Sequence, residues 1–372
     1  MMYSSTIRPR IHPGDYDLFV GMDVDKRSIA ITTRDHLDLG KSLMMPHDAD
    51  LVLSYFHNRH AGKRVAFVYE AGPTGFGLHD AIVAEGHTCL VVAPQAVPTA
   101  RGKRVRTNRL DSIKLAVQLR GGQLVGIHVP AGRYRELREL TALRNSQIDG
   151  IRATKCRIKA LLLRNSLEFP KAPDSGQWSK RLTADLRGLN CTGAVRFKLD
   201  SLLDELAWQW GNVLKTQLAL RTVLATDEEF WDSMRYLMSV SGVGWVVASH
   251  YLARVGDWRK LGRSDETSSF IGLVPSEDST GDRADRGRIT KGGDKKLRSL
   301  LIQAAWVAIR KDSELREFYD RVYRSHPRNV AARVAIVAVA RKLAVRMHCV
   351  LWERREYEIK PCEKEAESPT CG

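Results

Sequence analysis

The sequence predicts an α/β N-terminal region, followed by a pair of long helices and a mainly α-helical C-terminal region. Short apolar runs at 18–22, 64–69 and 89–93 alternate with helix-like stretches, a pattern typical of a mixed or parallel sheet covered on both faces. From residue 133 onward, leucine and isoleucine recur mostly at three- and four-residue spacings, which predicts helices. The expected divisions are a flexible leader (1–15), an α/β domain (16–130), a helical arm (131–225), a C-terminal helical domain (226–355) and a disordered tail (356–372).

Composition limits the class of protein. The chain has 372 residues, and its hydrophobic content of 43% supports packed cores and excludes a disordered chain. The net charge of +16 favours a polyanionic partner, nucleic acid first, over a basic surface that serves only solubility. The six cysteines form no Cys-x-x-Cys pair, which argues against a zinc module. Since residues 1–13 lack an apolar signal core and no run has membrane-spanning length, we expect a cytoplasmic protein with no membrane partner.

Two acidic residues follow apolar strand-like runs in the α/β region. Asp23 ends the run that begins at Leu18, and Glu70 ends the run 64–69. Ligands gather at the carboxyl ends of parallel strands, so these side chains are expected to converge although they are distant in sequence. A hairpin with an acid on its inner strand is also how ribonuclease-H-like nucleases hold divalent metal. The structural alternative for Asp23 is a residue that forms a turn.

A basic segment with two metal-ligand candidates follows. Asn108 and Asp111 come just before the helix-like stretch 113–119, where an acid is also favoured by the helix dipole. With Asp23 and Glu70 in place, we interpret Asp111 as a metal ligand. The preceding cations are expected to hold phosphate, with a solvated loop as the alternative. These cations are Arg101, Lys103, Arg104, Arg106 and Arg109.

The predicted arm consists of two helical patterns, 133–165 and 194–222, joined by a proline-bearing break. This arrangement predicts an antiparallel coiled coil that serves dimerisation or lies along nucleic acid. An ordinary helical insertion is the alternative. The apolar spacing of the second helix is imperfect, because the position expected after Val213 is Gln217 and the apolar residue is Leu218.

Two glycine-containing segments stand out in the C-terminal region. Gly242 and Gly244 lie in a turn between helix-like stretches, typical of a helix-hairpin-helix whose bare amides approach a DNA phosphate. A tight turn with glycines for helix packing is the alternative.

The second segment runs from Ser276 to Arg298 and is predicted to be a loop before a helix. A serine in such a loop, Ser279, can attack phosphorus, while Arg288, Lys291 and Arg298 stabilise the charge on the transferring group. A simple turn is the alternative for Ser279.

The assembled motifs resemble one known family, the insertion-sequence one-ten family of transposases, also called bridge recombinases, which includes the Piv invertase. The similarity spans about residues 17–350. The N-terminal motifs that carry it are Gly21-Met22-Asp23-Val24-Asp25-Lys26, Tyr69-Glu70-Ala71-Gly72 and Arg106-Thr107-Asn108-Arg109-Leu110-Asp111-Ser112. The C-terminal motifs are Val240-Ser241-Gly242-Val243-Gly244, Gly272-Leu273-Val274-Pro275, Ser279-Thr280-Gly281 and Ile289-Thr290-Lys291-Gly292-Gly293.

The resemblance implies a RuvC-like (RNase-H-like) N-terminal domain with a four-acid Mg²⁺ site, two ions per site, and a C-terminal transposase domain with a catalytic serine. Asp23, Glu70 and Asp111 match three of the acids, and Ser279 matches the nucleophile. The fourth position, usually Asp, is Asn108 here, whose neutral oxygen should lower metal affinity.

The implied partners are donor and target DNA, a structured guide (bridge) RNA and further copies of the chain as a dimer or tetramer. The implied setting is the bacterial cytoplasm, in association with the nucleoid. Two other functions stay open from the residues alone. One is a Holliday-junction-type metal-dependent endonuclease that never uses Ser279, and the other is a non-catalytic nucleic-acid scaffold.

Overall fold

The computed structural model describes residues 9–98, 107–170, 178–262, 264–280 and 283–359, and within these ranges it does not describe the side chains of 264–265, 277–280 and 283–286. The chain divides into two compact units, Met1–Val129 and Pro130–Gly372, and each is described by itself. In the described part of the chain, no helix has the length and apolar character needed to cross a membrane.

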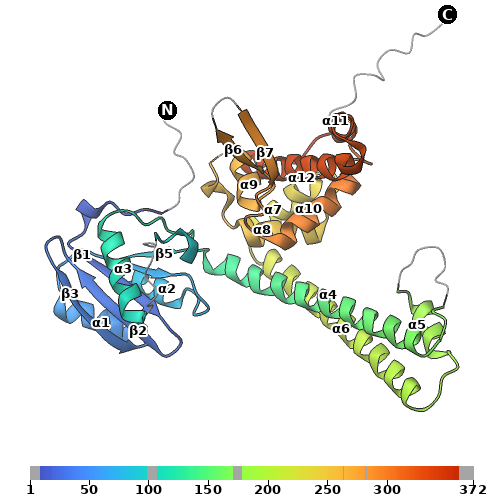
Figure 1. The fold of residues 1–372 in the computed structure, drawn as a ribbon, viewed down its shortest axis with the longest axis horizontal. Helices are drawn as coiled ribbons and strands as arrows, with labels where there is room; N and C mark the ends of the chain where they lie inside the picture. Colours follow the sequence, from blue (N-terminus) through green and yellow to red (C-terminus); the bar gives the residue numbers. More distant parts are fainter. Residues whose placement is uncertain (1–8, 99–106, 171–177, 263, 281–282, 360–372) are drawn as a thin grey trace, which may run out of the picture. The chain divides into compact units, whose positions relative to one another are not determined.

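A five-stranded sheet forms the centre of the N-terminal unit (Figure 1). Its order is β3-β2-β1-β4-β5, with β1 antiparallel to β2 and parallel to β4. The strands are β1 (Leu18–Val24), β2 (Ser28–Arg34), β3 (Leu39–Pro46), β4 (Val65–Glu70) and β5 (Thr88–Val92). The mixed sheet expected from the sequence is confirmed. Strand β3 was not predicted, because it is an edge strand with mostly exposed side chains and therefore carries little apolar signal.

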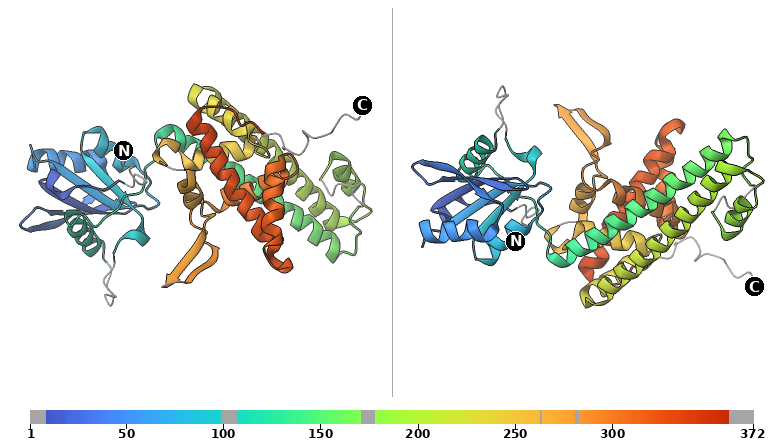
Figure 2. Two further views of the ribbon diagram at one scale, coloured as in Figure 1. Left: turned by 90° about the horizontal axis from the view of Figure 1, so that it is seen from above. Right: turned by 90° about the horizontal axis from the view of Figure 1, so that it is seen from below.

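Helices cover both faces of this sheet, as predicted (Figure 2). One face packs against α1 (Ala49–Arg59) and α2 (Gly77–Ala84) through a core that includes Val20 and Met22. The opposite face packs against α3 (Asn108–Arg120) through a core that includes Phe19 and Val68. Short 3-10 turns, η1 (Pro13–Asp15) and η2 (Pro94–Ala96), flank these elements. Because side chains alternate along a strand, the face of each acid can be read from its neighbours.

Gly21 lets α3 lie directly on strand β1. A Cβ atom at this position would come within 2.1 Å of the Ser112 carbonyl oxygen and 2.4 Å of the Ala116 amide nitrogen. The helix is also attached to β2 by a hydrogen bond of 2.8 Å between the Thr32 and Ser112 hydroxyls, both buried. The first turns of α3 are therefore held against the middle of the sheet.

The second unit begins with two long helices that run side by side, α4 (Gly132–Arg164) and α6 (Gly193–Ala225), with the short α5 (Lys180–Arg187) packed at one end (Figure 1). Ile151 and Ile158 of α4 pack with Leu202 and Leu206 of α6. Past Val213 the buried face of α6 continues through Thr216, Leu220 and Leu224. The imperfect spacing at 217–218 is thus explained, because Leu218 is exposed and Thr216 takes the buried position.

Six helices and a hairpin complete the described part of the second unit. The helices are α7 (Glu228–Ser239), α8 (Trp245–Val255), α9 (Ser264–Ile271), α10 (Lys295–Ala308), α11 (Ser313–Arg324) and α12 (Arg328–Glu353), with a 3-10 turn η3 (Trp258–Lys260). They share one hydrophobic core with the base of the arm, which includes Leu137 and Leu220. Arg133 of α4 fixes this junction by ion pairs of 2.6 Å to both Asp227 and Glu229.

The loop predicted from Ser276 up to the helix that contains Arg298 is wrong. The structure has an antiparallel hairpin there, β6 (Pro275–Thr280) paired with β7 (Arg283–Ile289). Polar residues dominate both strands, so the apolar alternation that marks a strand in a sequence is missing. Cross-strand pairing of the backbones defines this element.

Candidate functional site

Asp23 and Glu70 lie on the same face of the sheet. Strands β1 and β4 are parallel with Met22 opposite Tyr69, so the next pair along the register is Asp23 and Glu70. Asp23 alternates with Phe19 and Gly21, and Glu70 with Ala66 and Val68, all of which face α3. The two carboxylates are therefore neighbours beneath this helix, as the sequence predicted from their positions at strand ends.

Helix α3 brings Asn108 and Asp111 to the same edge. It begins at Asn108 rather than at 113, because the Thr107 hydroxyl accepts a hydrogen bond from the Leu110 amide and caps the first turn. Both site candidates are thus in the first helical turn, one turn before the residues that contact Gly21. Asn108 and Asp111 are each partly exposed, as are Asp23 and Glu70.

The closeness of the acids has a measurable electrostatic consequence. Partial burial, together with the carboxylates of Asp111, Asp25 and Glu70, raises the pKa of Asp23 to about 6. Like charges held near one another disfavour ionisation unless a cation compensates them. A raised carboxyl pKa at such a cluster is typical of functional sites.

Asp25 is a fourth acid at this site that sequence reasoning missed. Its carboxylate accepts a hydrogen bond from the Asn108 side-chain amide, across 83 positions of sequence. The available signal was its spacing of two from Asp23, which puts both side chains on one side of an extended chain. The charged residues Lys26 and Arg27 that follow it carry no apolar pattern that would have drawn attention to this position.

The chemistry of these side chains fits a hard divalent cation. Carboxylate and amide oxygens are the ligands that Mg²⁺ and Ca²⁺ prefer. Among the described residues, no three His, Cys, Asp or Glu side chains are arranged as a metal-binding group. The acids of this site are therefore near one another but do not surround a common ion position. A bound ion would offset the repulsion that raises the pKa of Asp23.

Of the five cations expected to hold phosphate near this site, one can be placed. Arg109 is exposed in the first turn of α3, next to Asn108. Arg101, Lys103, Arg104 and Arg106 lie outside the described residues.

Ser279 belongs to strand β6 of the hairpin, where it is paired with Ala284 of β7. Its side chain lies outside the described part of the structure. Ser276, on the same strand, donates its hydroxyl proton to the Arg288 carbonyl oxygen at 3.0 Å. The side chains of Arg288 and Lys291 are exposed near the base of the hairpin, where they can meet an anion.

Arg298 has a structural position instead. It is buried, and its guanidinium donates hydrogen bonds to the carbonyl oxygens of Ile271, at 3.0 Å, and Gly292. It thereby joins the two glycine motifs at the base of the hairpin. These motifs touch through their backbones, since a Cβ at Gly272 would lie 2.1 Å from the Gly292 carbonyl oxygen.

The two glycines predicted to approach DNA phosphate have different surroundings. Gly242 has a φ of +82°, and a Cβ there would lie 2.4 Å from the Ala304 carbonyl oxygen of α10, so helix packing explains this glycine. Gly244 is the N-cap of α8 and makes no side-chain cap, and a Cβ atom at this position would have open space within 4 Å. Of the two, Gly244 alone leaves bare amides at a helix start, as the helix-hairpin-helix interpretation requires.

Comparison with known proteins gives a consistent assignment for both halves of the chain. Residues 20–166 match a DEDD transposase profile of IS110 elements, and residues 234–320 match the profile described as transposase IS116/IS110/IS902 family. The chain is 31% identical over 303 residues to a putative transposase, y4qE, of Sinorhizobium fredii, covering 78% of this chain and 72% of that protein. It is also 25% identical over 333 residues to the transposase for insertion sequence element IS1328 of Yersinia enterocolitica, covering 87% and 94%.

The first profile spans the sheet, the acids and the first arm helix, while the second spans the hairpin and its supporting glycines. A DEDD nuclease domain implies a divalent metal ion, in agreement with the oxygen ligands gathered under α3. A transposase joins and cleaves DNA by phosphoryl transfer and must bind DNA. This chain belongs to the IS110 family of DNA transposases.

Proposed function

We propose that Asp23, Glu70, Asn108 and Asp111 bind two Mg²⁺ ions and that this site activates DNA for strand cleavage. The observation that supports the proposal is the placement of Asp23 and Glu70 side by side under the first turn of α3, with the raised pKa that results. When bound, the ions would polarise the scissile phosphate and stabilise its developing charge. The protein's part is to hold the oxygen ligands on elements that are fixed by the core.

Asp25 is proposed to supply the negative charge that Asn108 lacks. The Asn108 amide donates to the Asp25 carboxylate, so this acid is held beside Asp23. With Asp25 included, the site has the same total negative charge as a site of four acids, although Asn108 is neutral. An outer residue of this kind typically changes metal affinity by about 10- to 100-fold.

Ser279 is proposed as the nucleophile. Its oxygen would form a bond to the phosphorus of the DNA backbone while the bond from phosphorus to a deoxyribose oxygen breaks, and the serine proton is transferred to the departing hydroxyl. The phosphoserine link conserves the bond energy, so a free hydroxyl of another strand can later reverse the reaction without ATP. Exposed Arg288 and Lys291 support this assignment because they can stabilise charge on the phosphoryl group.

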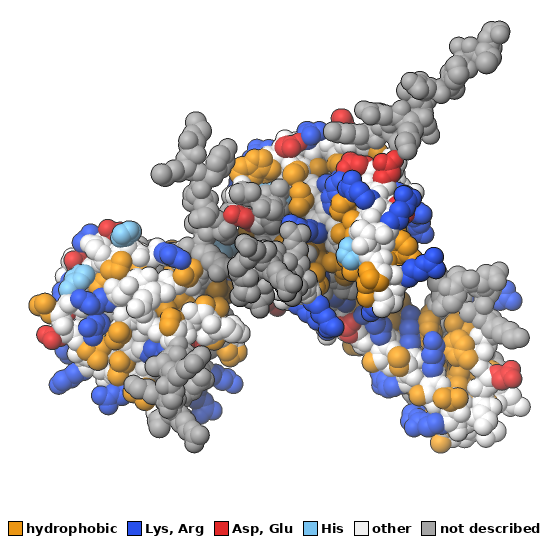
Figure 3. Space-filling view, turned by 45° about the horizontal axis from the view of Figure 1, so that its top comes forward, with side chains coloured by type: hydrophobic (Ala, Val, Ile, Leu, Met, Phe, Trp, Pro, Cys, Tyr) orange, Lys and Arg blue, Asp and Glu red, His pale blue; other side chains and the backbone are white. Residues whose placement is uncertain are grey.

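A structured guide RNA is proposed to supply sequence recognition by pairing with donor and target DNA. The net charge of +16 supports binding of two kinds of nucleic acid. In Figure 3 lysine and arginine side chains recur along the arm between apolar ones, which suits contacts to phosphate that do not depend on sequence.

A homo-oligomer, dimer or tetramer, is proposed to form through the arm. Helix α6 exposes a side with Trp208, Leu214 and Leu218, which are 69%, 64% and 67% accessible. An apolar stripe on the solvent side of a helix is typical of a surface that another helix covers. The active site would then combine the acids of one copy with Ser279 of another.

The test is to trap the covalent protein–DNA adduct on an end-labelled element-end DNA with Mg²⁺ and guide RNA. Wild type and Thr280→Ala should form the adduct, and Ser279→Ala should form none. An adduct that persists in Ser279→Ala would move the nucleophile to Thr280 or Ser276. Cleavage without any adduct in the wild type would favour a hydrolytic junction endonuclease, and absence of metal-dependent cleavage would favour a scaffold.

The composite site has its own experiment. Asp23→Ala and Ser279→Ala proteins should each be inert, and their mixture should recover part of the recombination because mixed assemblies contain intact composite sites. If mixed oligomers form, as shown by two affinity tags, and recombination stays absent, each chain uses its own two sites.

A further inference from the structure

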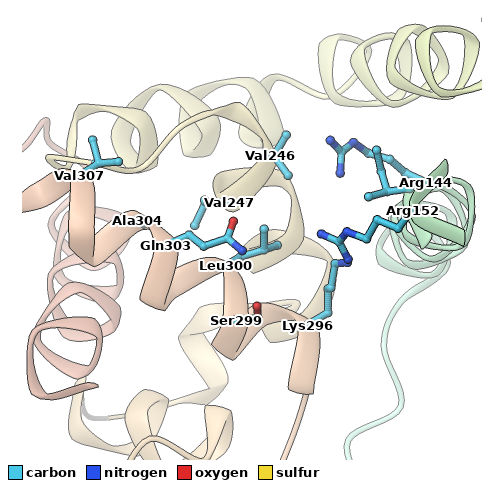
Figure 4. Close-up of a pocket in the computed structure, with 12 residues that line it drawn as sticks. Arg144, Arg152, Val246, Val247, Lys296, Ser299, Leu300, Gln303, Ala304 and Val307 are labelled. Atoms are coloured by element: carbon cyan, nitrogen blue, oxygen red, sulfur yellow. The ribbon is translucent and has the colours of Figure 1, made fainter. Parts of the chain in front are cut away.

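A pocket of about 380 Å³ lies in the second unit between the arm and two helices of the C-terminal region. Its walls come from α4, α8 and α10, and Figure 4 shows the side chains that line it. The size falls in the range of about 300–1,000 Å³ typical of pockets for small organic groups. None of its lining residues belongs to the acid site or the β6–β7 hairpin.

Three cations line one side of this pocket. Arg144 and Arg152 of α4 and Lys296 of α10 direct their nitrogens into the same space (Figure 4). Asp149 pairs with Arg152 at 2.8 Å and with Lys296 at 3.6 Å, so one exposed carboxylate is shared by two of the three cations. Converging like charges are unfavourable unless an anion balances them.

Arg144 differs from the other two in having a buried donor. Its Nε atom is buried and has no hydrogen-bond acceptor among the described residues. Burial lowers the pKa of its guanidinium, because it removes water from the charged group. A buried donor without an acceptor is unfavourable, and a bound oxyanion would supply the missing acceptor.

The start of helix α8 adds to the positive character of this side. Val246 and Val247 line the pocket in the first turn, and the N-cap is Gly244, which offers no side-chain acceptor to the first amides. The N-terminal end of a helix carries partial positive charge and free amide donors. The three cations and the N-terminal end of α8 together fit a phosphate group.

The other side of the pocket is apolar with two hydrogen-bonding groups. Val246, Leu300 and Val307 supply apolar side chains, and Gln303 and Ser299 of α10 add an amide and a hydroxyl to the lining (Figure 4). A phosphate alone would leave this surface uncovered. A nucleobase has an apolar face and polar edges that suit both features.

We propose that this pocket binds one unstacked nucleotide of a single-stranded nucleic acid, with its phosphate at Arg144, Arg152 and Lys296 and its base against Val246, Leu300 and Val307. A base inside a duplex cannot enter such a pocket without being extruded, so the site distinguishes single strands from duplexes. The proposal assumes that the protein handles nucleic acid, which its family requires, but it does not depend on the metal site or on Ser279.

The experiment measures binding of full-length protein, in EDTA so that no cleavage occurs, to fluorescent oligonucleotides of about 20 nucleotides. DNA and RNA single strands are compared with the duplex, and 2-aminopurine in the strand reports unstacking. Arg144→Gln should weaken single-strand binding about tenfold, since it removes hydrogen bonds to a charged group. It should also reduce the slope of log K against log salt by about 0.7.

Ser299→Trp is the second variant, because it fills the pocket from an exposed helical position and keeps all three cations. It should abolish the rise in 2-aminopurine fluorescence and weaken single-strand binding, with duplex binding unchanged. Arg164→Gln is the matched control, an exposed cation at the far end of the same helix, and should leave the fluorescence signal unchanged.

Three results would overturn the proposal. One is equal loss of single-strand and duplex binding in Arg144→Gln with the 2-aminopurine signal intact, which would mean contact with backbone phosphate only. Another is unchanged single-strand binding in a folded Ser299→Trp protein. The third is binding of free AMP as tightly as the strand, which would make the pocket a mononucleotide site. Loss of cleavage in Asp23→Ala affects none of these readings.

Discussion

The acids of the N-terminal unit and the serine of the C-terminal unit are held in contrasting ways. Asp23, Glu70 and Asp111 are on two central strands and the helix that crosses them, where the hydrophobic core fixes every backbone. Ser279 is on a two-stranded hairpin of polar residues, and none of the side chains that the structure describes on its strands is buried. Local stability follows the number of buried apolar contacts, so the backbone that carries the acids is expected to be the more stable of the two.

This difference explains why the C-terminal motifs contain so many structural residues. The N-terminal motifs carry the proposed metal ligands directly, with Gly21 as their packing residue. Around the hairpin, Gly272 and Gly293 allow backbone contact, and Arg298 joins the two segments. The C-terminal signature therefore describes mainly how the hairpin is anchored.

The largest expected effect comes from the acid site. Asp23→Ala should lower the rate of metal-dependent DNA cleavage at least about 10³-fold, because a metal ligand is lost. Gel-shift affinity should stay within about twofold, since many dispersed cations contact phosphate. Asp38→Ala, an exposed acid on the loop between β2 and β3, is the matched control and should cleave normally. Normal cleavage by the Asp23→Ala protein would remove this residue from the metal site.

Glycine substitutions should affect the functions of the two units separately. Gly21→Ala should cost at least about 3 kcal/mol in stability and abolish metal binding, because α3 must move away from β1. Gly272→Ala should leave metal binding intact and prevent adduct formation, since it breaks the backbone contact under the hairpin. Chemical denaturation and calorimetric Mn²⁺ titration measure both. Gly77→Ala, which has open space around it, should behave as wild type. Loss of metal binding in Gly272→Ala would contradict the separation.

Arg298 should behave as an anchor of the hairpin. Arg298→Met removes the donors to the Ile271 and Gly292 carbonyls, at an expected cost of about 2 kcal/mol. Protease cleavage within the hairpin should become faster while DNA affinity changes little. Arg288→Met, on an exposed position, should have the reverse pattern, with an unchanged hairpin and weaker adduct formation. Equal protease rates for Arg298→Met and wild type would exclude the anchoring role.

The Asn108–Asp25 pair gives a smaller effect that is specific to this chain. Asp25→Asn should weaken Mn²⁺ binding about tenfold, as outer carboxylates at metal sites typically do. Asn108→Asp should keep or raise activity. The double variant Asp25→Asn/Asn108→Asp should regain most of the affinity. It exchanges the amide and the carboxylate between the two positions, so the charge and the hydrogen bond are both kept. A double variant as weak as Asp25→Asn would mean that position 108 cannot hold the charge.

The smallest effect is on stability without metal. The folded-state pKa of Asp23 is raised to about 6, so its favourable contribution exists at low pH and is lost as pH rises through about 6. Asp23→Asn should therefore stabilise the metal-free protein at about pH 7.5 by about 1 kcal/mol, a figure reduced for partial exposure. The gain should disappear near pH 4, where wild-type Asp23 is protonated. Asp38→Asn should show no such pH-dependent gain.

The α/β sheet, the paired helices and the acids at the strand ends could all be predicted from the residues of each segment. Apolar runs and helical spacing follow from burial, which each segment carries in its own residues. Asp23 and Glu70 could be placed together because strand ends of a parallel pair must meet. The packing of the arm past Val213 could not be predicted from apolar spacing, because Thr216 is buried there and Leu218 is exposed.

Other contacts between distant residues follow from the packing of the whole fold. The Asn108–Asp25 contact, the burial of Arg298 and the meeting of Arg144 with Lys296 depend on how elements pack, and no local pattern encodes them. The polar hairpin around Ser279 likewise arises from cross-strand hydrogen bonds between backbones, to which side-chain hydropathy contributes almost no signal. Periodicity records which side of a segment is buried, whereas the partner on that side is set by the whole fold.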